Sequence, residues 1–147
     1  MGWVAEKFKE HEDTKNHLDG LWNGLRDSCQ IAVSEFVVKI DQLNVERRDC
    51  SARGKRCQRI TKGTQFIEIF ISESDQSVRS ALGTDKEIVL AYYRLKDGGK
   101  GLEFFEERDG GSVSITADVV CRKALEEFLF NPPPFGYLIG LTSQTSA

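Results

Sequence analysis

The chain has 147 residues, of which 39% are apolar, a size and composition typical of one globular domain with a sizeable core. Its 20 basic and 23 acidic residues leave a net charge of −3, which excludes a strong overall field that would attract nucleic acid or an anionic membrane. The sequence has no run of about 18 apolar residues, and its start has no basic segment followed by an apolar one. We therefore expect a single soluble domain spanning residues 1–147, located in the cytoplasm and not bound to a membrane.

Residues 3–40 carry the pattern of a long amphipathic helix. Apolar side chains recur at alternating steps of four and three residues, as expected for one buried stripe: Leu18, Trp22, Leu25, Cys29, Ala32 and Phe36. Residues 1–16 are mostly charged and are predicted to form a polar helical extension. Gly20 and Gly24 indicate either close backbone packing or a break. The alternative is a helix that ends near Ser28, followed by a strand over residues 31–40, which are rich in Val, Ile and Phe.

Turn-forming residues divide the chain after residue 43 into segments of strand length. They predict an antiparallel meander of five to seven strands, near residues 44–50, 55–61, 65–72, 76–82, 87–95, 101–107 and 111–116. The clearest pair is the hairpin formed by residues 88–95 and 101–107, whose branched and aromatic side chains flank an Asp-Gly-Gly turn. We expect this hairpin to lie in the centre of the sheet.

A second helix is predicted near the C-terminal end of the chain. Val120, Ala124 and Phe128 lie at helical spacing, and Thr116 is a natural N-cap. Three consecutive prolines beginning at residue 132 end this helix, since proline lacks the backbone N–H that a helix needs. Residues 132–147 are predicted to be a tail that is apolar at first and then disordered. The predicted fold class is α+β, with a long N-terminal helix, an antiparallel meander and a C-terminal helix.

Aromatic side chains indicate that the predicted sheet has a second apolar face. Within residues 65–72 the isoleucines lie on one side of the strand, whereas Phe66 and Phe70 lie on the other, and later strands also carry apolar groups on both sides. We expect the N-terminal helix to cover one face, and the C-terminal helix or the tail to cover part of the other. The alternative covering is a partner protein, a second copy of the chain or an apolar ligand. Glu68 and Glu103, beside these rings, are expected to be solvated at the sheet edges. The candidate apolar contact face consists of Phe66, Phe70, Tyr92 and Phe105.

Basic residues gather around a predicted turn at residues 51–56. If residues 44–61 form a hairpin, Arg47 would lie opposite Lys55 to Arg59, concentrating positive charge for phosphates or an acidic partner. No aromatic side chains for base stacking accompany them, so binding of nucleic acid is the weaker alternative. Protection of an edge strand against aggregation is the interpretation we favour for these charges. The candidate partner-binding or anion-binding residues are Arg47, Arg48, Arg53, Lys55, Arg56, Arg59 and Lys62.

The four cysteines are too few and too unevenly spaced for a disulfide-stapled secreted fold. We expect reduced thiols, although a turn at residues 51–56 would let Cys50 and Cys57 face each other and be oxidised. Their interval and the two histidines, His11 and His17, do not provide the ligands of a zinc site. We predict no metal and no cofactor.

No catalytic constellation is recognisable in the sequence. His11 and His17 lie six residues apart in the polar extension, with no serine or cysteine elbow near them. The glycines at residues 98–101 lack the spacing of a phosphate loop and lie between two strands. We therefore expect a small non-catalytic binding module whose partner is another protein or a second copy of the chain, as in a homodimer. The alternatives are a small enzyme or apolar-ligand carrier with a site between sheet and helix, and a weak binder of nucleic acid or an acidic partner.

Overall fold

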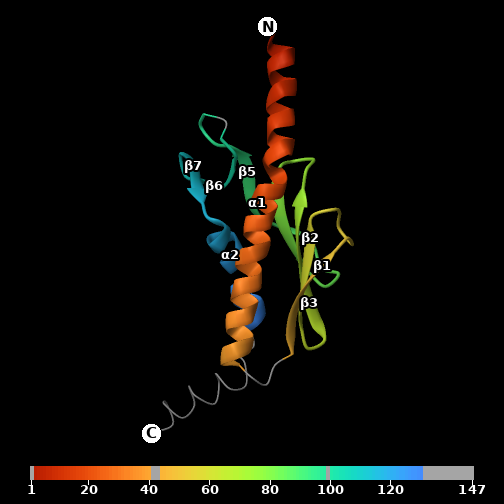
Figure 1. The fold of residues 1–147 in the computed structure, drawn as a ribbon. Coiled ribbons are helices and arrows are strands. Elements are labelled where there is room, and N and C mark those ends of the chain that lie inside the picture. The colour runs from red at the N-terminus through yellow and green to blue at the C-terminus, as the bar shows by residue number, and fades with distance from the viewer. Residues whose placement is uncertain (1, 41–43, 99, 131–147) are drawn as a thin grey trace.

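A computed structural model describes residues 2–40, 44–98 and 100–130 of the chain. Figure 1 shows a long helix that crosses a sheet of seven strands, with a shorter helix beside it. This arrangement confirms the predicted α+β class and the antiparallel meander. The predicted tail, residues 132–147, lies outside the described residues.

Helix α1 runs without a break from Trp3 to Lys39, a length of about 55 Å. The alternative of a strand over residues 31–40 is therefore wrong. One stripe of side chains faces the sheet, and its buried members are Thr14, Leu18, Trp22, Leu25, Cys29, Val33 and Phe36. Phe8 is 70% exposed, because the first turns of α1 project beyond the sheet (Figure 1). The predicted polar extension is thus helical, and of its described residues Thr14 alone is buried.

Gly20 and Gly24 lie on the exposed side of α1. The helix continues through both residues, and a side chain added at either position would meet no atom within 4 Å. Neither close packing nor a helix break explains these glycines, so both interpretations made from the sequence are wrong.

The seven strands form one antiparallel sheet in which each strand pairs with the next along the chain. The strands are β1 (Val45–Cys50), β2 (Cys57–Lys62), β3 (Gln65–Ser72), β4 (Ser77–Leu82), β5 (Ile88–Leu95), β6 (Leu102–Arg108) and β7 (Gly111–Ile115). The hairpin of β5 and β6 occupies the fifth and sixth places, and β4 is the central strand. The predicted central position of the β5–β6 hairpin is wrong, because four strands precede this hairpin and only one follows it.

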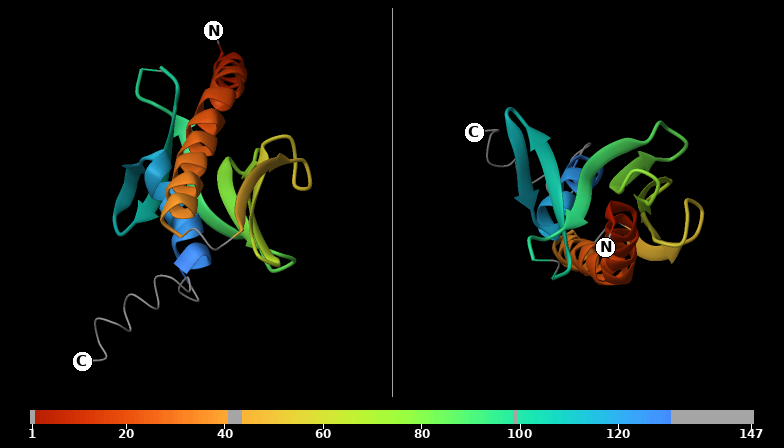
Figure 2. Two further views of the ribbon diagram at one scale, coloured as in Figure 1. Left: turned by 60° about the horizontal axis from the view of Figure 1, so that its bottom comes forward. Right: turned by 90° about the horizontal axis from the view of Figure 1, so that it is seen from above.

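Helix α2 spans Ala117–Phe130 and follows β7 almost directly. The hydroxyl of Thr116 accepts a hydrogen bond of 3.3 Å from the backbone N–H of Val119, which confirms Thr116 as the N-cap. α2 packs against α1 and against β5, and Figure 2 shows the sheet curving around both helices. Both helices therefore cover the same face of the sheet, called the inner face below. The prediction places the C-terminal helix or the tail over part of the opposite, outer face. The predicted position of the helix is wrong, and the tail lies outside the described residues.

The hydrophobic core lies between the two helices and the inner face. It is one cluster, and its fully buried members include Leu25 of α1, Val120 of α2 and, from the sheet, Ile60, Ile69 and Val78. Each such side chain contributes about 1.5–3 kcal/mol on burial. Across the described ranges, neither helix is long and apolar enough to cross a membrane.

Candidate functional site

The outer face of the sheet carries the aromatic residues that strand alternation predicts, and arginine side chains lie over them. The guanidinium of Arg53 lies 5.4 Å from the ring centroid of Phe70, and that of Arg59 lies 4.3 Å from the ring centroid of Phe66. Phe70 is only 4% exposed. Each cation–π contact contributes about 0.5–1 kcal/mol at such a surface. Arginines of β2 and of the β1–β2 loop, and not helix α2, therefore cover these two rings.

The other two rings of the predicted contact face lie at the far end of the sheet. Tyr92 and Phe105 are directly opposite each other on β5 and β6, with ring centroids 6.0 Å apart. The guanidinium of Arg94 lies 4.2 Å from the ring centroid of Phe105. All four rings share the outer face, but β4 separates them into two pairs. Their role as a contact surface stays a prediction, and the arginines already contact three of the four rings.

Glu68 lies between the arginines of the outer face. Its side chain is 4% exposed, and it accepts hydrogen bonds of 2.9 Å from Arg53 and of 2.8 and 3.2 Å from Arg59. Burial raises the pKa of Glu68, but the hydrogen bonds and charges of Arg59 and Arg53 lower it by more, so this pKa lies below its usual range. The expectation of a solvated Glu68 is wrong because β3 lies inside the sheet, between β2 and β4. Glu103 is less buried and accepts a hydrogen bond from Ser114.

The predicted basic patch is divided among several parts of the fold. Arg56 donates hydrogen bonds of 2.7 and 3.0 Å to Asp19 of α1. Lys62, on the inner face, donates hydrogen bonds of 2.7 and 3.2 Å to the backbone carbonyls of Phe128 and Leu129 at the end of α2. Arg53 and Arg59 both pair with Glu68. The four basic side chains therefore belong to three separate networks, around Glu68, Asp19 and the end of α2.

The pairing of β1 with β2 differs from the predicted pairing, and two further members of the patch show the difference. Arg47 lies opposite Ile60, and Arg48 lies opposite Arg59, because β2 begins at Cys57 and Lys55 belongs to the loop. The predicted pairing of Arg47 with Lys55 to Arg59 is wrong. The seven residues are thus not brought together into one concentrated anion site, and an anion-binding role stays a prediction.

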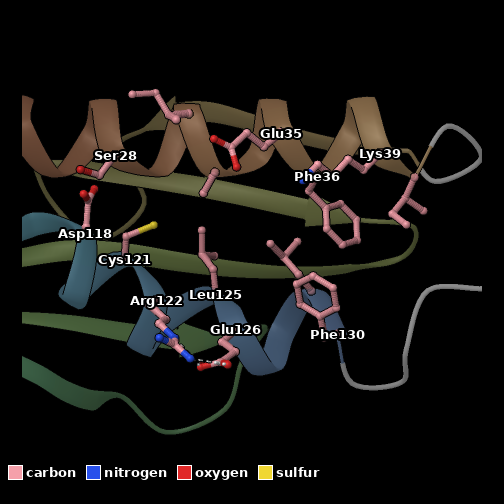
Figure 3. Close-up of a pocket in the computed structure, with 14 residues that line it drawn as sticks. Ser28, Glu35, Phe36, Lys39, Asp118, Cys121, Arg122, Leu125, Glu126 and Phe130 are labelled. Carbon is pink, nitrogen blue, oxygen red and sulfur yellow. Dashed lines mark hydrogen bonds and ion pairs between the residues drawn. The ribbon is translucent and has the colours of Figure 1, made fainter. Parts of the chain in front are cut away.

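A groove of about 660 Å³ runs between α1 and α2 (Figure 3). Its floor is apolar and includes Phe36 of α1 and both Leu125 and Leu129 of α2. Phe36 and Phe130 meet edge to face near the C-terminal ends of the helices, with ring centroids 5.3 Å apart. Ile31, on the α1 side, is 61% exposed. The volume falls within the range of about 300–1,000 Å³ that is usual for ligand sites.

Charged side chains lie only at the rim of this groove. Arg122 and Glu126, one turn apart on α2, form an ion pair with each other, at 3.0 Å. Glu35 on α1 and Asp118 on α2 are carboxylates on opposite sides of the groove, and within the described ranges neither has an ion-pair partner. Lys39 of α1 also lines the groove, so besides the Arg122–Glu126 pair its charged lining residues are two carboxylates and one ammonium group.

One thiol lies among the residues that line the groove. The thiol of Cys121, which lines it, is 4% exposed. Hydrogen bonding between Cys121 and Cys29, together with burial, raises the pKa of Cys29, whereas the same hydrogen bond lowers the pKa of Cys121, the thiol that lines the groove. The groove's described lining residues include no histidine.

The sequence carries a weak signal for this groove. Ile31 lies beside the predicted helical stripe and not within it, and Phe130 follows the last stripe residues of the second helix. Such positions indicate apolar contacts outside the core. They do not show that the two helices lie side by side on one face, since that depends on the order and curvature of the strands.

Comparisons with protein-family models, with curated proteins and with solved structures found no match.

Proposed function

We propose that this protein is an interaction module that binds an amphipathic helical segment of a partner protein in the α1–α2 groove. The observation that carries this proposal is the exposed apolar margin of the groove. Ile31 and Phe130, which line the groove together with the buried Leu125 and Leu129, are 61% and 43% exposed. A third helix laid along the groove would cover both margins.

The shape of the groove supports a helix as the occupant. Two helices form its walls, and α2 has 14 residues, a length of about 21 Å. A partner helix of three to four turns matches that length, and it would present apolar residues at positions i, i+3 or i+4, and i+7, as in other helix-in-groove complexes. The groove is open along one side, whereas a site for a small molecule generally encloses most of its ligand.

Two carboxylates at the rim support a basic partner. Glu35 and Asp118 lie on opposite walls and have no ion-pair partner in the part of the chain that the structure describes. Lysine or arginine side chains flanking the apolar stripe of a bound helix would reach these carboxylates. Such rim charges mainly set the association rate and the specificity.

The proposal is tested with a labelled 14-residue amphipathic peptide, which carries leucine at the i, i+3 or i+4, and i+7 positions and lysine beside them. Fluorescence anisotropy measures its binding to the full chain, and a peptide with glutamate in place of lysine is the matched ligand control. We expect saturable binding that is tighter for the lysine peptide and weakens as salt is added.

Two exposed residues of α1 provide matched protein variants. Ile31→Glu places a charge on the groove margin and should weaken binding by at least about tenfold. Val38→Glu changes a residue that is 80% exposed on the same helix but does not line the groove, so it should leave binding unchanged. Equal effects of the two variants, or no saturable binding, would contradict the proposal. So would a dimer that only Ile31→Glu dissociates in sedimentation, since the occupant would then be a second copy of the chain.

A further inference from the structure

Cys50 and Cys57 form a pair of thiols on the outer face of the sheet, away from the groove. They are directly opposite each other in the antiparallel pairing of β1 and β2, and their Sγ atoms are 2.7 Å apart. Opposite residues of antiparallel strands have Cα atoms about 4.5–5.5 Å apart, which lies within the range of disulfide-bonded cysteines. The backbone of the hairpin is therefore already placed for a bond between these two sulfur atoms.

The two thiols differ in accessibility. Cys57 is 3% exposed, and burial followed by hydrogen bonding to Cys50 raises the pKa of Cys57 to about 12. Cys50 is half-buried, so a reagent in solution reaches Cys50 first. Glu68 lies 3.9 Å from the Cys50 sulfur, and Arg53 and Arg59 hold its carboxylate.

We propose that Cys50 and Cys57 are a redox-active dithiol that is oxidised to an intramolecular disulfide by small disulfides such as glutathione disulfide. Cys50 is deprotonated and attacks one sulfur of the small disulfide, forming a mixed disulfide and releasing one thiolate, which takes up a proton. Cys57 then loses its proton and attacks the Sγ of Cys50, which releases the second small thiol. Two protein thiols are oxidised, and one small disulfide is reduced to two thiols.

The disulfide would close the segment of residues 51–56, which contains two arginines with structural contacts. Arg53 donates a hydrogen bond of 2.9 Å to Glu68 and lies over Phe70, whereas Arg56 is bonded to Asp19 of α1. A covalent bond at the base of this loop restricts the motions that would break those contacts. Oxidation therefore fastens the β1–β2 loop both to the outer face and to α1.

Zinc is the competing ligand for the same side chains. One ligand atom from each of Cys50, Cys57 and Glu68 lies within 4.8 Å of the others, the closeness that a metal site needs. Both carboxylate oxygens of Glu68, however, already accept hydrogen bonds from Arg53 and Arg59. Two guanidinium charges beside the site and only three protein ligands favour the disulfide over a cation.

The test uses the full chain, reduced and then equilibrated in glutathione buffers of increasing oxidised fraction. The protein is quenched with acid, denatured and alkylated, and peptide mass spectrometry counts the free thiols. We expect two of the four cysteines to lose reactivity together, with a linked peptide that joins Cys50 to Cys57. Cys29 and Cys121 are 0% and 4% exposed, and they serve as internal controls that stay alkylatable.

Variants make the assignment specific. In Cys57→Ser the attacking thiol has no resolving partner, so Cys50 should accumulate a glutathione adduct that the wild type does not retain. Cys121→Ser should leave the Cys50–Cys57 linkage intact. The proposal is overturned if a stable glutathione adduct remains on Cys50 in the wild type, or if no linked peptide forms in any buffer. Protection of both thiols by added zinc, lost in Glu68→Gln, would overturn it in favour of a metal site.

Hydrogen exchange gives a readout that does not depend on cysteine variants. The backbone amides of residues 51–56 should exchange more slowly in the oxidised wild type than in the reduced wild type, whereas the amides of β7 should be unchanged. Equal exchange of residues 51–56 in the two states would show that the bond does not fasten the loop.

Discussion

Arg59 of β2 lies directly opposite Glu68 of β3, and its guanidinium donates two hydrogen bonds, of 2.8 and 3.2 Å, to one carboxylate oxygen of Glu68. The same guanidinium lies over the ring of Phe66. Long arginine side chains can cover apolar surface with their alkyl parts while the charged ends stay paired or solvated. This relationship explains how the outer face carries phenylalanines although neither helix of the described ranges lies over it.

Glu68→Gln should destabilise the protein by roughly 1–3 kcal/mol, because it leaves Arg53 and Arg59 without their shared counter-charge. This loss of stability is smaller than that expected for a fully buried ion pair, because Arg53 and Arg59 are both partly exposed. Glu46→Gln is the matched control. Its ion pair with Arg48 lies on the exposed edge strand, and its loss should change the stability by at most about 0.5 kcal/mol. Urea unfolding measures both variants, and equal shifts in midpoint would contradict the structural role of Glu68.

The contribution of Glu68 to stability should depend on pH in a defined direction. Its pKa in the folded protein lies below the ordinary value of 4.5, so the folded state binds this proton less readily than the unfolded state. The stabilisation is fully present above the ordinary value and is lost as the pH falls through the folded pKa. The difference in unfolding free energy between wild type and Glu68→Gln should therefore shrink when urea titrations are repeated from about pH 7 down to about pH 3. A difference that stays constant over this range would refute the assigned charge state.

The local structure of this chain is readable from its sequence because each element carries its own signal. Alternating steps of three and four residues place α1, and turn residues separate the strands. The hydroxyl of Thr116 marks the start of α2. These features depend on neighbours along the chain, so a single sequence contains them.

The arrangement of the outer face and the groove depends on contacts between residues far apart in sequence. Arg53 covers Phe70, and Arg56 pairs with Asp19, only once the hairpin of β1 and β2 has folded back over the sheet. Apolar residues on both sides of a strand predict two coverings, but the pattern does not say that one of them is made of arginine side chains. The position of α2 beside α1 likewise follows from the curvature of the whole sheet (Figure 2).

Lys62→Met should weaken the end of α2 that forms part of the groove. The Lys62 ammonium donates hydrogen bonds to the carbonyls of Phe128 and Leu129 in the last described turn of α2. The residues four positions further on, Pro132 and Pro133, have no backbone N–H to donate to these carbonyls. Removing the ammonium group should cost about 1–2 kcal/mol and speed hydrogen exchange in residues 126–130. It should also reduce binding of the lysine peptide, because Leu129 and Phe130 line the groove. Lys55→Met, at an exposed loop position, is the control, and an equal loss of stability in that variant would contradict the capping role.

Gly20→Ala and Gly24→Ala should each stabilise the protein by up to about 1 kcal/mol, because alanine favours a helix and the unfolded chain loses conformational freedom. Both positions are exposed within α1, and an added Cβ would meet no atom within 4 Å. Gly63→Ala is the control of opposite sign. Gly63 has a φ of +61° in the turn between β2 and β3, where an alanine side chain costs roughly 1–2 kcal/mol. Thermal unfolding should therefore show higher midpoints for the two helix variants and a lower one for Gly63→Ala. A fall in midpoint for Gly20→Ala or Gly24→Ala would mean that these positions are occupied by a partner, such as a second helix packed closely against the exposed side of α1.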